Sequence, residues 1–395
     1  MKFKNCLWKR SLGEITFYHT KSDYRVIVDE DTLGVLCDMC SKTEKELTER
    51  QRDYYQKLAA KNMMEPGIGE IPQERSQSPL AYVEIEVSSA CNLNCKHCFA
   101  CNEGGFIDID FFYKLLEELR KLGAIVVSFN GGEPLLHPHL IPMMQRTYNE
   151  GFSLILFTNG TLLTPEFCEK IGAMGLNKVY VSLDGFRHQH ELMRGEGTFD
   201  QTVRGVSLLR KNGIRVWINS MIHPGNENEV AAFKQFCCQE LGVNGMRLSP
   251  VQPIGNAREN LAMFQYPQNA QKSLVDLPDM ETVNTHPNSR TLPCCAGISQ
   301  IYIAANGNFY PCDFFRRASM SLGNALQSAL SELYQAHLAQ DSILTNFDCG
   351  KLTSCQGCSA FSTCKGGCRA RALLLNQDIY GKDPLACAKR GLLKE

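Results

Sequence analysis

Four cysteines lie close together in the stretch SSACNLNCKHCFAC, which covers residues 88–101. Cys91, Cys95 and Cys98 follow the spacing C-x3-C-x2-C, and Cys101 comes shortly after them. Disulfides between such close neighbours would be strained, whereas this spacing lets one loop wrap a compact metal ion or cluster. Structural zinc usually takes its ligands as two separated pairs, and no matching pair with histidines follows nearby. A [4Fe–4S] cluster takes thiolates readily, and three of them leave one iron free to bind a substrate.

A second group of cysteines lies beyond residue 290. Part of it, CQGCSAFSTCKGGC, has the spacing C-x2-C-x5-C-x3-C, and GNFYPC precedes it. One zinc ion would take four of these sulfurs and leave the others without a metal, so their number favours iron–sulfur clusters. The group consists of Cys294, Cys295, Cys312, Cys349, Cys355, Cys358, Cys364, Cys368 and Cys387.

The overall composition narrows the class of protein. The chain has 395 residues, 44% of them apolar, and a formal net charge of -1. It is long enough for two or three folded units and offers no basic field for nucleic acid or an anionic membrane. The N-terminus lacks a signal-peptide core, and no apolar run is long enough to span a bilayer. We therefore predict a soluble cytoplasmic protein that binds neither nucleic acid nor membrane, in which 19 cysteines favour metal and redox chemistry.

The elements that must position the first cysteine group alternate between strand and helix patterns from residue 81 to about 250. Several strand patterns are almost continuously apolar, which is typical of parallel strands covered on both faces. Six such units fit an α/β fold built as a partial (β/α)6 barrel, similar to a TIM barrel, with its chemistry at the C-terminal ends of the strands. The candidate strands are YVEIEV (82–87), AIVVSFN (124–130), SLILFT (153–158), KVYVSL (178–183), IRVWINSM (214–221) and GMRLSP (245–250).

The residues after the first four strands would lie at one face of this barrel. The cysteine loop follows the first strand, GGEP (131–134) the second, TNG (158–160) the third and DG (184–185) the fourth. Paired glycines let the backbone turn tightly and approach a ligand, and Glu133 would accept hydrogen bonds from an ammonium group. Taken alone, GGEP is more simply explained as a strand-to-helix turn.

The motif CNLNCKHC resembles the signature of the radical S-adenosylmethionine (radical SAM) superfamily, and GGEP is similar to that family's second motif. In the family, the open iron binds the amino and carboxylate groups of SAM, and an electron from the cluster cleaves SAM to methionine and a 5′-deoxyadenosyl radical. By this resemblance Cys91, Cys95 and Cys98 hold the cluster and Cys101 is a bystander, although a fourth thiolate from Cys101 would close the cluster. The resemblance assigns SAM contacts to His97 near the adenine, to Gly131, Gly132 and Glu133 at the methionyl end, and to Arg194, Asn219 and Ser220 at the ribose or carboxylate.

The C-terminal cysteines resemble the SPASM extension of radical SAM enzymes that modify peptides, in which two auxiliary clusters are bound. The cofactors implied by both resemblances are SAM and three [4Fe–4S] clusters. By this resemblance the outer cluster is held by Cys355, Cys358, Cys364 and Cys387, and the inner one by Cys312, Cys368 and either Cys294 or Cys295. The fourth inner ligand stays open between Cys349, the other member of the 294/295 pair, and a free iron.

The first 63 residues contain two short alternating runs, EITFYHT and YRVIVDE, and two helical patterns. This arrangement resembles the winged-helix (PqqD-like) element that binds leader peptides, to which a leader would add a strand. A cap that binds nothing is the alternative. We expect a leader-recognition domain (1–63), a linker of polar and proline-rich composition (64–80), the radical SAM barrel with a connecting segment (81–290) and the SPASM domain (291–395).

By resemblance to the maturases of pyrroloquinoline quinone and mycofactocin precursors, we predict an enzyme that abstracts a hydrogen from a ribosomally made precursor peptide. The product would be a thioether, a carbon–carbon crosslink or a similar modification. The expected partners are the precursor with its leader and an electron donor of the flavodoxin or ferredoxin type. One alternative is the tetrapyrrole branch of the superfamily, which modifies haem-precursor side chains. Another is a non-catalytic electron-transfer protein, against which GGEP argues, because an electron carrier needs no site for an amine.

Overall fold

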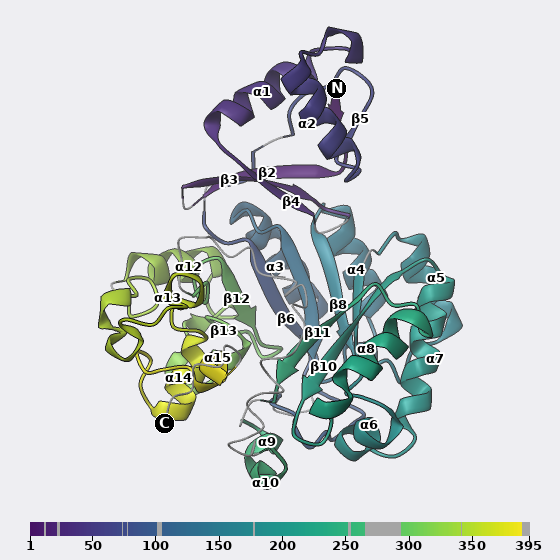
Figure 1. Ribbon diagram of the computed structural model, residues 1–395, viewed down its shortest axis with the longest axis vertical. Helices are drawn as coiled ribbons and strands as arrows, with labels where there is room; N and C mark the ends of the chain where they lie inside the picture. Colours follow the sequence, from purple (N-terminus) through teal and green to yellow (C-terminus); the bar gives the residue numbers. More distant parts are fainter. Residues whose placement is uncertain are drawn as a thin grey trace.

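One nine-stranded sheet runs through the protein, and the computed structural model describes residues 1–11, 13–21, 24–72, 74–76, 78–100, 105–176, 178–251, 254–264, 294–340 and 342–388. Six neighbouring strands are parallel and follow one another in chain order. They are β6 (Tyr82–Ser88), β7 (Val126–Gly131), β8 (Ser153–Thr158), β9 (Lys178–Ser182), β10 (Arg215–Ile222) and β11 (Gly245–Pro250) (Figure 1). The predicted α/β class with a partial barrel is confirmed.

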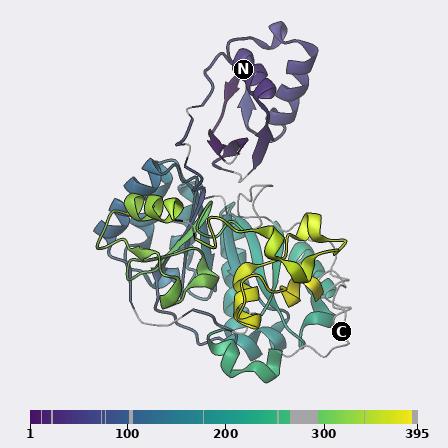
Figure 2. The same ribbon diagram turned by 90° about the vertical axis from the view of Figure 1, so that its left-hand side faces the viewer.

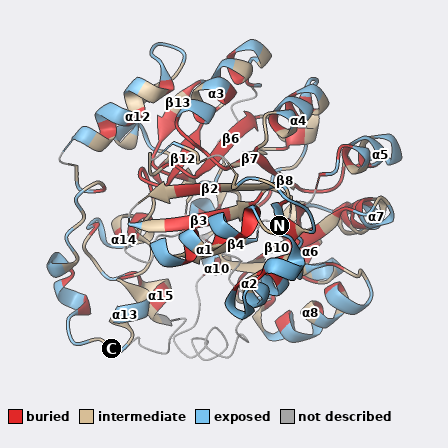
Figure 3. Cartoon of the chain, turned by 90° about the horizontal axis from the view of Figure 1, so that it is seen from above, coloured by how far each residue is buried: buried red, intermediate tan, exposed pale blue. Residues whose placement is uncertain are grey.

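Helices cover the outer side of these strands. In α3 (Ile109–Lys121) apolar residues recur at helical spacing, so one stripe is buried and the opposite side faces solvent (Figure 3). Asp108 caps this helix by accepting a hydrogen bond from the backbone N–H of Phe111 at 2.8 Å. Among the described residues, no helix is long and apolar enough to cross a lipid bilayer. The other barrel helices are α4 (Leu140–Asn149), α5 (Pro165–Ala173), α6 (Arg187–Arg194), α7 (Thr198–Lys211) and α8 (Val230–Gln239), followed by the short α9 (Asn256–Glu259) and α10 (Leu261–Phe264).

The C-terminal part of the chain continues the same sheet. β12 (Gln300–Ile303) pairs in parallel with β6, and β13 (Asn308–Tyr310) and β14 (Gly323–Asn324) follow it antiparallel. Polar contacts join the two parts, from Gln300 Nε2 to Glu84 Oε1 at 2.7 Å and from Arg316 Nη1 to Glu86 Oε1 at 2.6 Å. The sequence did not predict these strands. Helices α12 (Leu330–Ala339), α13 (Phe361–Cys364), α14 (Arg369–Asn376) and α15 (Pro384–Ala388) complete this part.

The N-terminal residues form a small unit with its own apolar core around Phe17, Met39 and Met63. Figure 2 shows this unit at one end of the molecule. A separate pairing of β1 (Lys2–Phe3) with β5 (Met64–Glu65) means that the linker predicted from residue 64 begins with a short strand. The unit consists of an antiparallel sheet of β2 (Cys6–Ser11), β3 (Glu14–His19) and β4 (Arg25–Val28), with α1 (Glu30–Cys40) and α2 (Glu49–Ala59).

The N-terminal unit contacts the barrel at the N-terminal ends of its first strands. Lys9 of β2 is buried, and its Nζ donates to the carbonyl oxygens of Leu80, before β6, and of Gly123, before β7. The linker covers the outer edge of β2, where the N–H of Arg75 donates to Trp8 O at 2.8 Å.

The ionisation of Lys9 is expected to make this contact pH-dependent. Burial, aided by the charge of Arg75, lowers the pKa of Lys9 from 10.5 to about 7. The folded state therefore binds fewer protons than the unfolded state between these values, and stability falls as the pH drops towards 7. We expect the free energy of unfolding to rise by on the order of 1 kcal/mol per pH unit above about pH 7. Denaturant titrations at several pH values measure this slope, and an equal slope in Lys9→Met would contradict the role of Lys9.

Candidate active site

The cysteine loop begins where β6 ends and packs against the glycine-rich turn after β7. The N–H of Gly132 donates to Ser88 O at 2.7 Å. A Cβ atom at Gly131, whose φ is 145°, would collide with the carbonyl oxygen of Ser88. One at Gly132 would collide with the carbonyl oxygen of Ala90 and lie 2.9 Å from Cys91 Cβ. The glycines therefore bring the turn directly against the cysteine loop, a use that the sequence did not reveal.

Glu133 presents a buried carboxylate beside this loop. Its Oε1 accepts hydrogen bonds from Thr158 Oγ1 at 2.7 Å and from the N–H of Leu135 at 3.1 Å, and its Oε2 accepts one from the N–H of Asn159 at 2.8 Å. Burial raises the pKa of Glu133 to about 6, and these hydrogen bonds partly offset the effect of burial. At neutral pH the group is mostly ionised, as binding an ammonium group requires.

Asn92, between the cysteines, ties the loop to the turn after β8. Its Nδ2 donates to Thr161 Oγ1 at 2.9 Å, and its Oδ1 accepts from Asn159 Nδ2 at 2.9 Å. The sequence placed TNG at the same face of the barrel as the cysteine loop but did not identify these residues as supports of the loop. The signal available in the sequence was the position of Asn92, which lies between cysteines predicted to bind metal.

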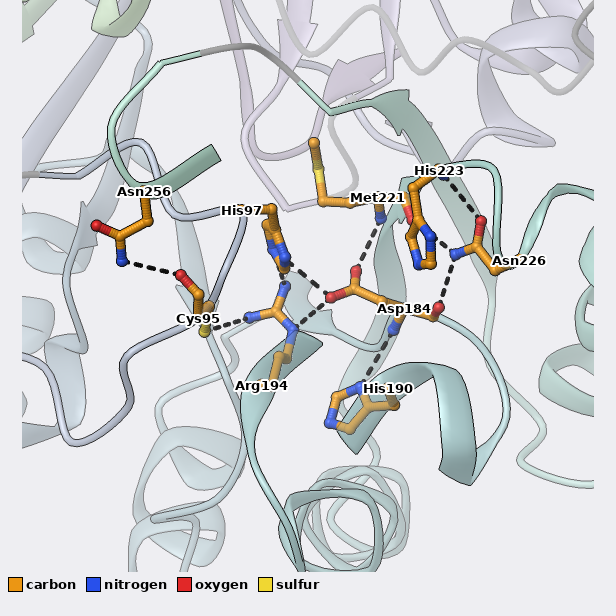
Figure 4. A network of polar contacts seen from close by, with 9 residues as sticks. All are labelled: Cys95, His97, Asp184, His190, Arg194, Met221, His223, Asn226 and Asn256. Atoms are coloured by element: carbon orange, nitrogen blue, oxygen red, sulfur yellow. Dashed lines mark hydrogen bonds and ion pairs between the residues drawn. The ribbon is translucent and has the colours of Figure 1, made fainter. Parts of the chain in front are cut away.

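A buried network surrounds Asp184, in the turn after β9 (Figure 4). Asp184 Oδ2 accepts from Arg194 Nε at 2.6 Å and lies 3.6 Å from His97 Nε2, and Oδ1 accepts from the N–H of Met221 at 2.8 Å. Burial, the largest single effect, would raise the pKa of Asp184, but the charge of Arg194, the smaller effects of His97 and His190 and the hydrogen bond from Arg194 together outweigh burial and hold this pKa well below its usual range. Asp184 is therefore ionised and fixes the guanidinium of Arg194.

Arg194 also reaches the cysteine loop. Its Nη1 lies 3.8 Å from Cys95 Sγ, and its Nη2 lies 3.3 Å from His97 Nε2. Burial raises the pKa of Cys95 to about 11, and the charge of Arg194 acts against this shift. The sequence assigned Arg194 to the ribose or carboxylate of SAM, whereas the structure engages its guanidinium with Asp184, His97 and Cys95.

His97 carries a polar atom without a partner. Its side chain is only 7% exposed, and Nδ1 has no hydrogen-bond partner in the described part of the chain. Burial lowers the pKa of His97 to about 4, so the ring is neutral at neutral pH. Because Arg194 Nη2 can only donate a hydrogen bond, Nε2 of His97 accepts it and carries no proton. We therefore assign the proton of the neutral ring to Nδ1 of His97. A buried N–H without a partner is rare, and an acceptor atom of a bound ligand such as adenine would satisfy it.

The remaining predicted residues of the barrel, Asn219 and Ser220, lie near the end of β10, one half-buried and the other buried. The backbone N–H of the next residue, Met221, joins the Asp184 network. The sequence missed Asn226, whose Nδ2 donates to the carbonyl oxygens of Asp184 and Met221 at 2.8 Å each.

The cysteines predicted for the inner cluster lie together. Cys294, Cys312 and Cys368 belong to one apolar cluster, and their thiols interact electrostatically. The Sγ of Cys295 lies 3.6 Å from Gln300 Oε1. Of the pair that the sequence left open, Cys294 packs in the apolar cluster with Cys312 and Cys368, and the thiol of Cys295 interacts with those of Cys294 and Cys368 as well.

The cysteines predicted for the outer cluster form a second group. The thiol of Cys387 interacts with those of Cys355 and Cys364. The N–H of Cys358 donates to Cys355 O at 3.2 Å, so Cys358 shares its turn. Cys349 begins a separate 3-10 turn, Cys349–Lys351.

These arrangements suit clusters better than single ions. In the described part of the chain, no three metal-binding side chains converge to hold one ion. In a [4Fe–4S] cluster each thiolate binds a different iron, so the ligands stay apart. The described cysteines are free thiols. Cys101, the alternative fourth ligand of the first cluster, lies outside the described residues.

Two parts of the chain match known families: residues 85–237 match the Radical SAM superfamily, and residues 294–359 match SPASM, an iron-sulfur cluster-binding domain. An AdoMet-dependent heme synthase of Methanosarcina barkeri (strain Fusaro / DSM 804) is 25% identical over 345 residues, which cover 78% of this chain and 96% of that protein. Mycofactocin maturase MftC of Mycobacterium tuberculosis (strain CDC 1551 / Oshkosh) is 24% identical over 320 residues, or 76% and 81%. The crystal structure of Streptococcus suis SuiB bound to precursor peptide SuiA aligns with a TM-score of 0.67 and 15% identity over 98% of this chain and 99% of SuiB.

Proposed function

Because this chain is a radical SAM enzyme with a C-terminal SPASM domain, we propose that it modifies a ribosomally made precursor peptide. The observation that supports this function best is the extent of the shared fold. The alignment with SuiB, which was crystallised with its precursor peptide, takes in 98% of this chain and so includes the N-terminal unit. Mycofactocin maturase, whose name also denotes maturation, matches 76% of this chain.

SAM and [4Fe–4S] clusters are the cofactors of this enzyme, and when bound they supply the one-electron chemistry that takes a hydrogen atom from the substrate. We propose Cys91, Cys95 and Cys98 as the ligands of the first cluster. The ionised carboxylate of Glu133 holds the ammonium group of SAM, and the Nδ1–H of His97 donates to the adenine.

The residues around these groups hold them in place. Gly131 and Gly132 allow the turn that carries Glu133 to lie against the cysteine loop. Arg194 positions Cys95 and His97 from its ion pair with Asp184. Asn219 and Ser220, at the end of β10, are our candidates for contacts with the ribose.

We propose that the C-terminal cysteines hold two auxiliary clusters. The outer one is assigned to Cys355, Cys358, Cys364 and Cys387. The inner one is assigned to Cys294, Cys312 and Cys368, with Cys295 and Cys349 as the remaining candidates for a fourth ligand. When bound, such clusters would supply an electron acceptor close to the substrate, which net oxidation of a product requires.

We propose that residues 1–63 bind the leader through β4. The outer edge of β4 has no strand partner among the described residues, whereas the linker covers the outer edge of β2. Because the N–H of His19 donates to Tyr24 O, hydrogen-bonded pairs alternate along β3 and β4, and the N–H and C=O of Ile27 point away from β3. An added leader strand would pair with these groups.

Replacing Ile27 by Pro tests this edge, because proline removes the outward N–H and leaves the bonds between β3 and β4 intact. We expect the affinity for the leader to fall about fivefold, since one main-chain hydrogen bond contributes about 1 kcal/mol and a tenfold change equals 1.4 kcal/mol. Fluorescence anisotropy with a labelled leader from a short reading frame beside the gene measures the affinity. Ile27→Ala, which keeps the N–H, is the matched control. Equal affinities of the two variants would rule out strand addition at β4.

A haem-related function is the second candidate, because the match with the heme synthase takes in 96% of that protein. It leaves about a fifth of this chain unmatched, and the match with mycofactocin maturase leaves about a quarter, so the covered share does not separate the two functions. Turnover of an iron-bearing tetrapyrrole by the anaerobic enzyme, unchanged in Ile27→Pro, would establish this function instead.

A further inference from the structure

The first turn of α14 faces two of the cysteines assigned to the inner auxiliary cluster. Cys368 directly precedes the helix as its N-cap residue, and its sulfur lies near the backbone N–H groups of Ala370 and Arg371 without forming a capping hydrogen bond. The N–H of Arg369 is directed at the sulfur of Cys294. The N–H groups in the first turn of a helix have no partner within the helix and carry partial positive charge, so they favour an anion.

The side chain of Arg369 adds a full positive charge at the same place. It is 0% exposed, and its nitrogens donate to backbone carbonyl oxygens. Nη1 donates to Ile379 at 2.9 Å and to Gly381 at 3.1 Å, and Nε donates to Gly367 at 3.3 Å. These bonds satisfy the donors but do not neutralise the charge.

The neighbouring Arg371 shows the contrast, because it pairs with Asp383 at 2.6 Å. No carboxylate in the described part of the chain lies within ion-pair distance of Arg369. A buried charge without a counter-charge is costly. Arg369 directly follows Cys368, which packs with Cys294 and Cys312 in one apolar cluster. An anion at the inner cysteines would therefore supply the counter-charge that Arg369 lacks among the described residues.

We propose that Arg369 and the first turn of α14 provide the counter-charge of the inner auxiliary cluster and raise its reduction potential. This inference rests on the proposed assignment of Cys294, Cys312 and Cys368 to that cluster, and not on the identity of the substrate. Net charge and hydrogen bonds to the sulfurs set the potential of such clusters. Reduction adds one negative charge, so a nearby cation stabilises the reduced form more than the oxidised form.

Redox titration of the anaerobically reconstituted full chain, followed by electron paramagnetic resonance, tests this. Cys312→Ala identifies the inner-cluster signal by its loss. In Arg369→Gln, the ratio of reduced to oxidised inner cluster at the wild-type midpoint should fall at least about tenfold, or about 59 mV for a one-electron couple. The other two clusters serve as internal controls and should not shift. Arg369→Lys, which keeps the charge, should stay near the wild-type value.

Each outcome decides the matter. Loss of the inner signal in Arg369→Gln with retention in Arg369→Lys would also support the proposal, because Lys keeps the positive charge that Gln removes while neither residue keeps the guanidinium group. Loss of the inner-cluster signal in both variants would show that Arg369 is needed only for the hydrogen bonds from its guanidinium to the backbone carbonyl oxygens, and would overturn the proposal. An unshifted midpoint in Arg369→Gln would overturn the proposal as well. A wild-type protein without a signal sensitive to Cys312 would instead overturn the ligand assignment, and this proposal with it.

Discussion

In the Cys95→Ala protein, reductive cleavage of SAM is expected to fall by at least about 10³-fold, because two thiolates do not retain the iron to which SAM binds. Cys95 is the buried member of its motif and the one that Arg194 contacts, at 3.8 Å. Anaerobic assays with dithionite measure the cleavage as 5′-deoxyadenosine separated by chromatography. Iron should fall from roughly 12 per chain to about 8, since one cluster of four irons is lost.

The matched control is Cys168→Ala, because Cys168 is buried in α5 and lies outside every proposed cluster site. It should retain its iron and cleave SAM at nearly the wild-type rate, with a small loss of stability from the missing sulfur. Wild-type cleavage by Cys95→Ala would mean that another thiol, such as that of Cys101, completes the cluster. Wild-type protein with about 4 irons per chain would contradict both auxiliary clusters.

Deleting residues 1–75 is expected to lower kcat/KM for the full precursor by about 100-fold while leaving SAM cleavage without peptide within about twofold. The reason is that a bound leader raises the effective concentration of the core segment at the active site. Mass spectrometry of the modified precursor measures kcat/KM. The SAM-cleavage rate of the truncated protein shows whether its barrel is still intact. This control is needed because the deletion uncovers the carbonyl groups of Leu80 and Gly123, to which Lys9 donates in the intact chain.

Adding residues 1–75 as a separate chain should restore part of the turnover, because the linker contributes only proximity. A precursor stripped of its leader should be processed equally by the intact and the truncated enzyme. If the truncated enzyme processed the full precursor as well as the intact chain does, the N-terminal unit would be a structural cap.

Much of the fold was predictable because each barrel strand is a short apolar run with polar turns at its ends. The patterns at 153–158 and 245–250 coincide with β8 and β11, and the other four differ from the observed strands by one or two residues at their ends. β12 was not predictable, because it has only four residues and its partner β6 lies more than 200 residues earlier. Its strand character depends on the sheet edge that it covers.

The candidate site divides in a similar way. The cysteine motif and Glu133 are visible in local sequence, because their chemistry depends on short spacings. The network around Asp184 is not, because it joins the turn after β9 with α6 and with the end of β10, which only the fold brings together. The difference between Cys294 and Cys295 is also hidden, because it depends on the direction in which each of two adjacent side chains points.

The N-terminal unit binds the barrel at the end opposite to the cysteine loop. A peptide held by this unit therefore has to span the length of the barrel to reach the loop. β6 begins beside Leu80, which Lys9 contacts, and ends at the loop after seven residues. At about 3.3 Å per residue, this strand spans roughly 20 Å. A leader held at β4 therefore has to be followed by a stretch of at least about six extended residues before the chain reaches the mouth of the barrel. If the leader binds at β4 as proposed, the distance from the leader determines which residue is modified, and we expect residues next to the leader to be spared whatever their side chains.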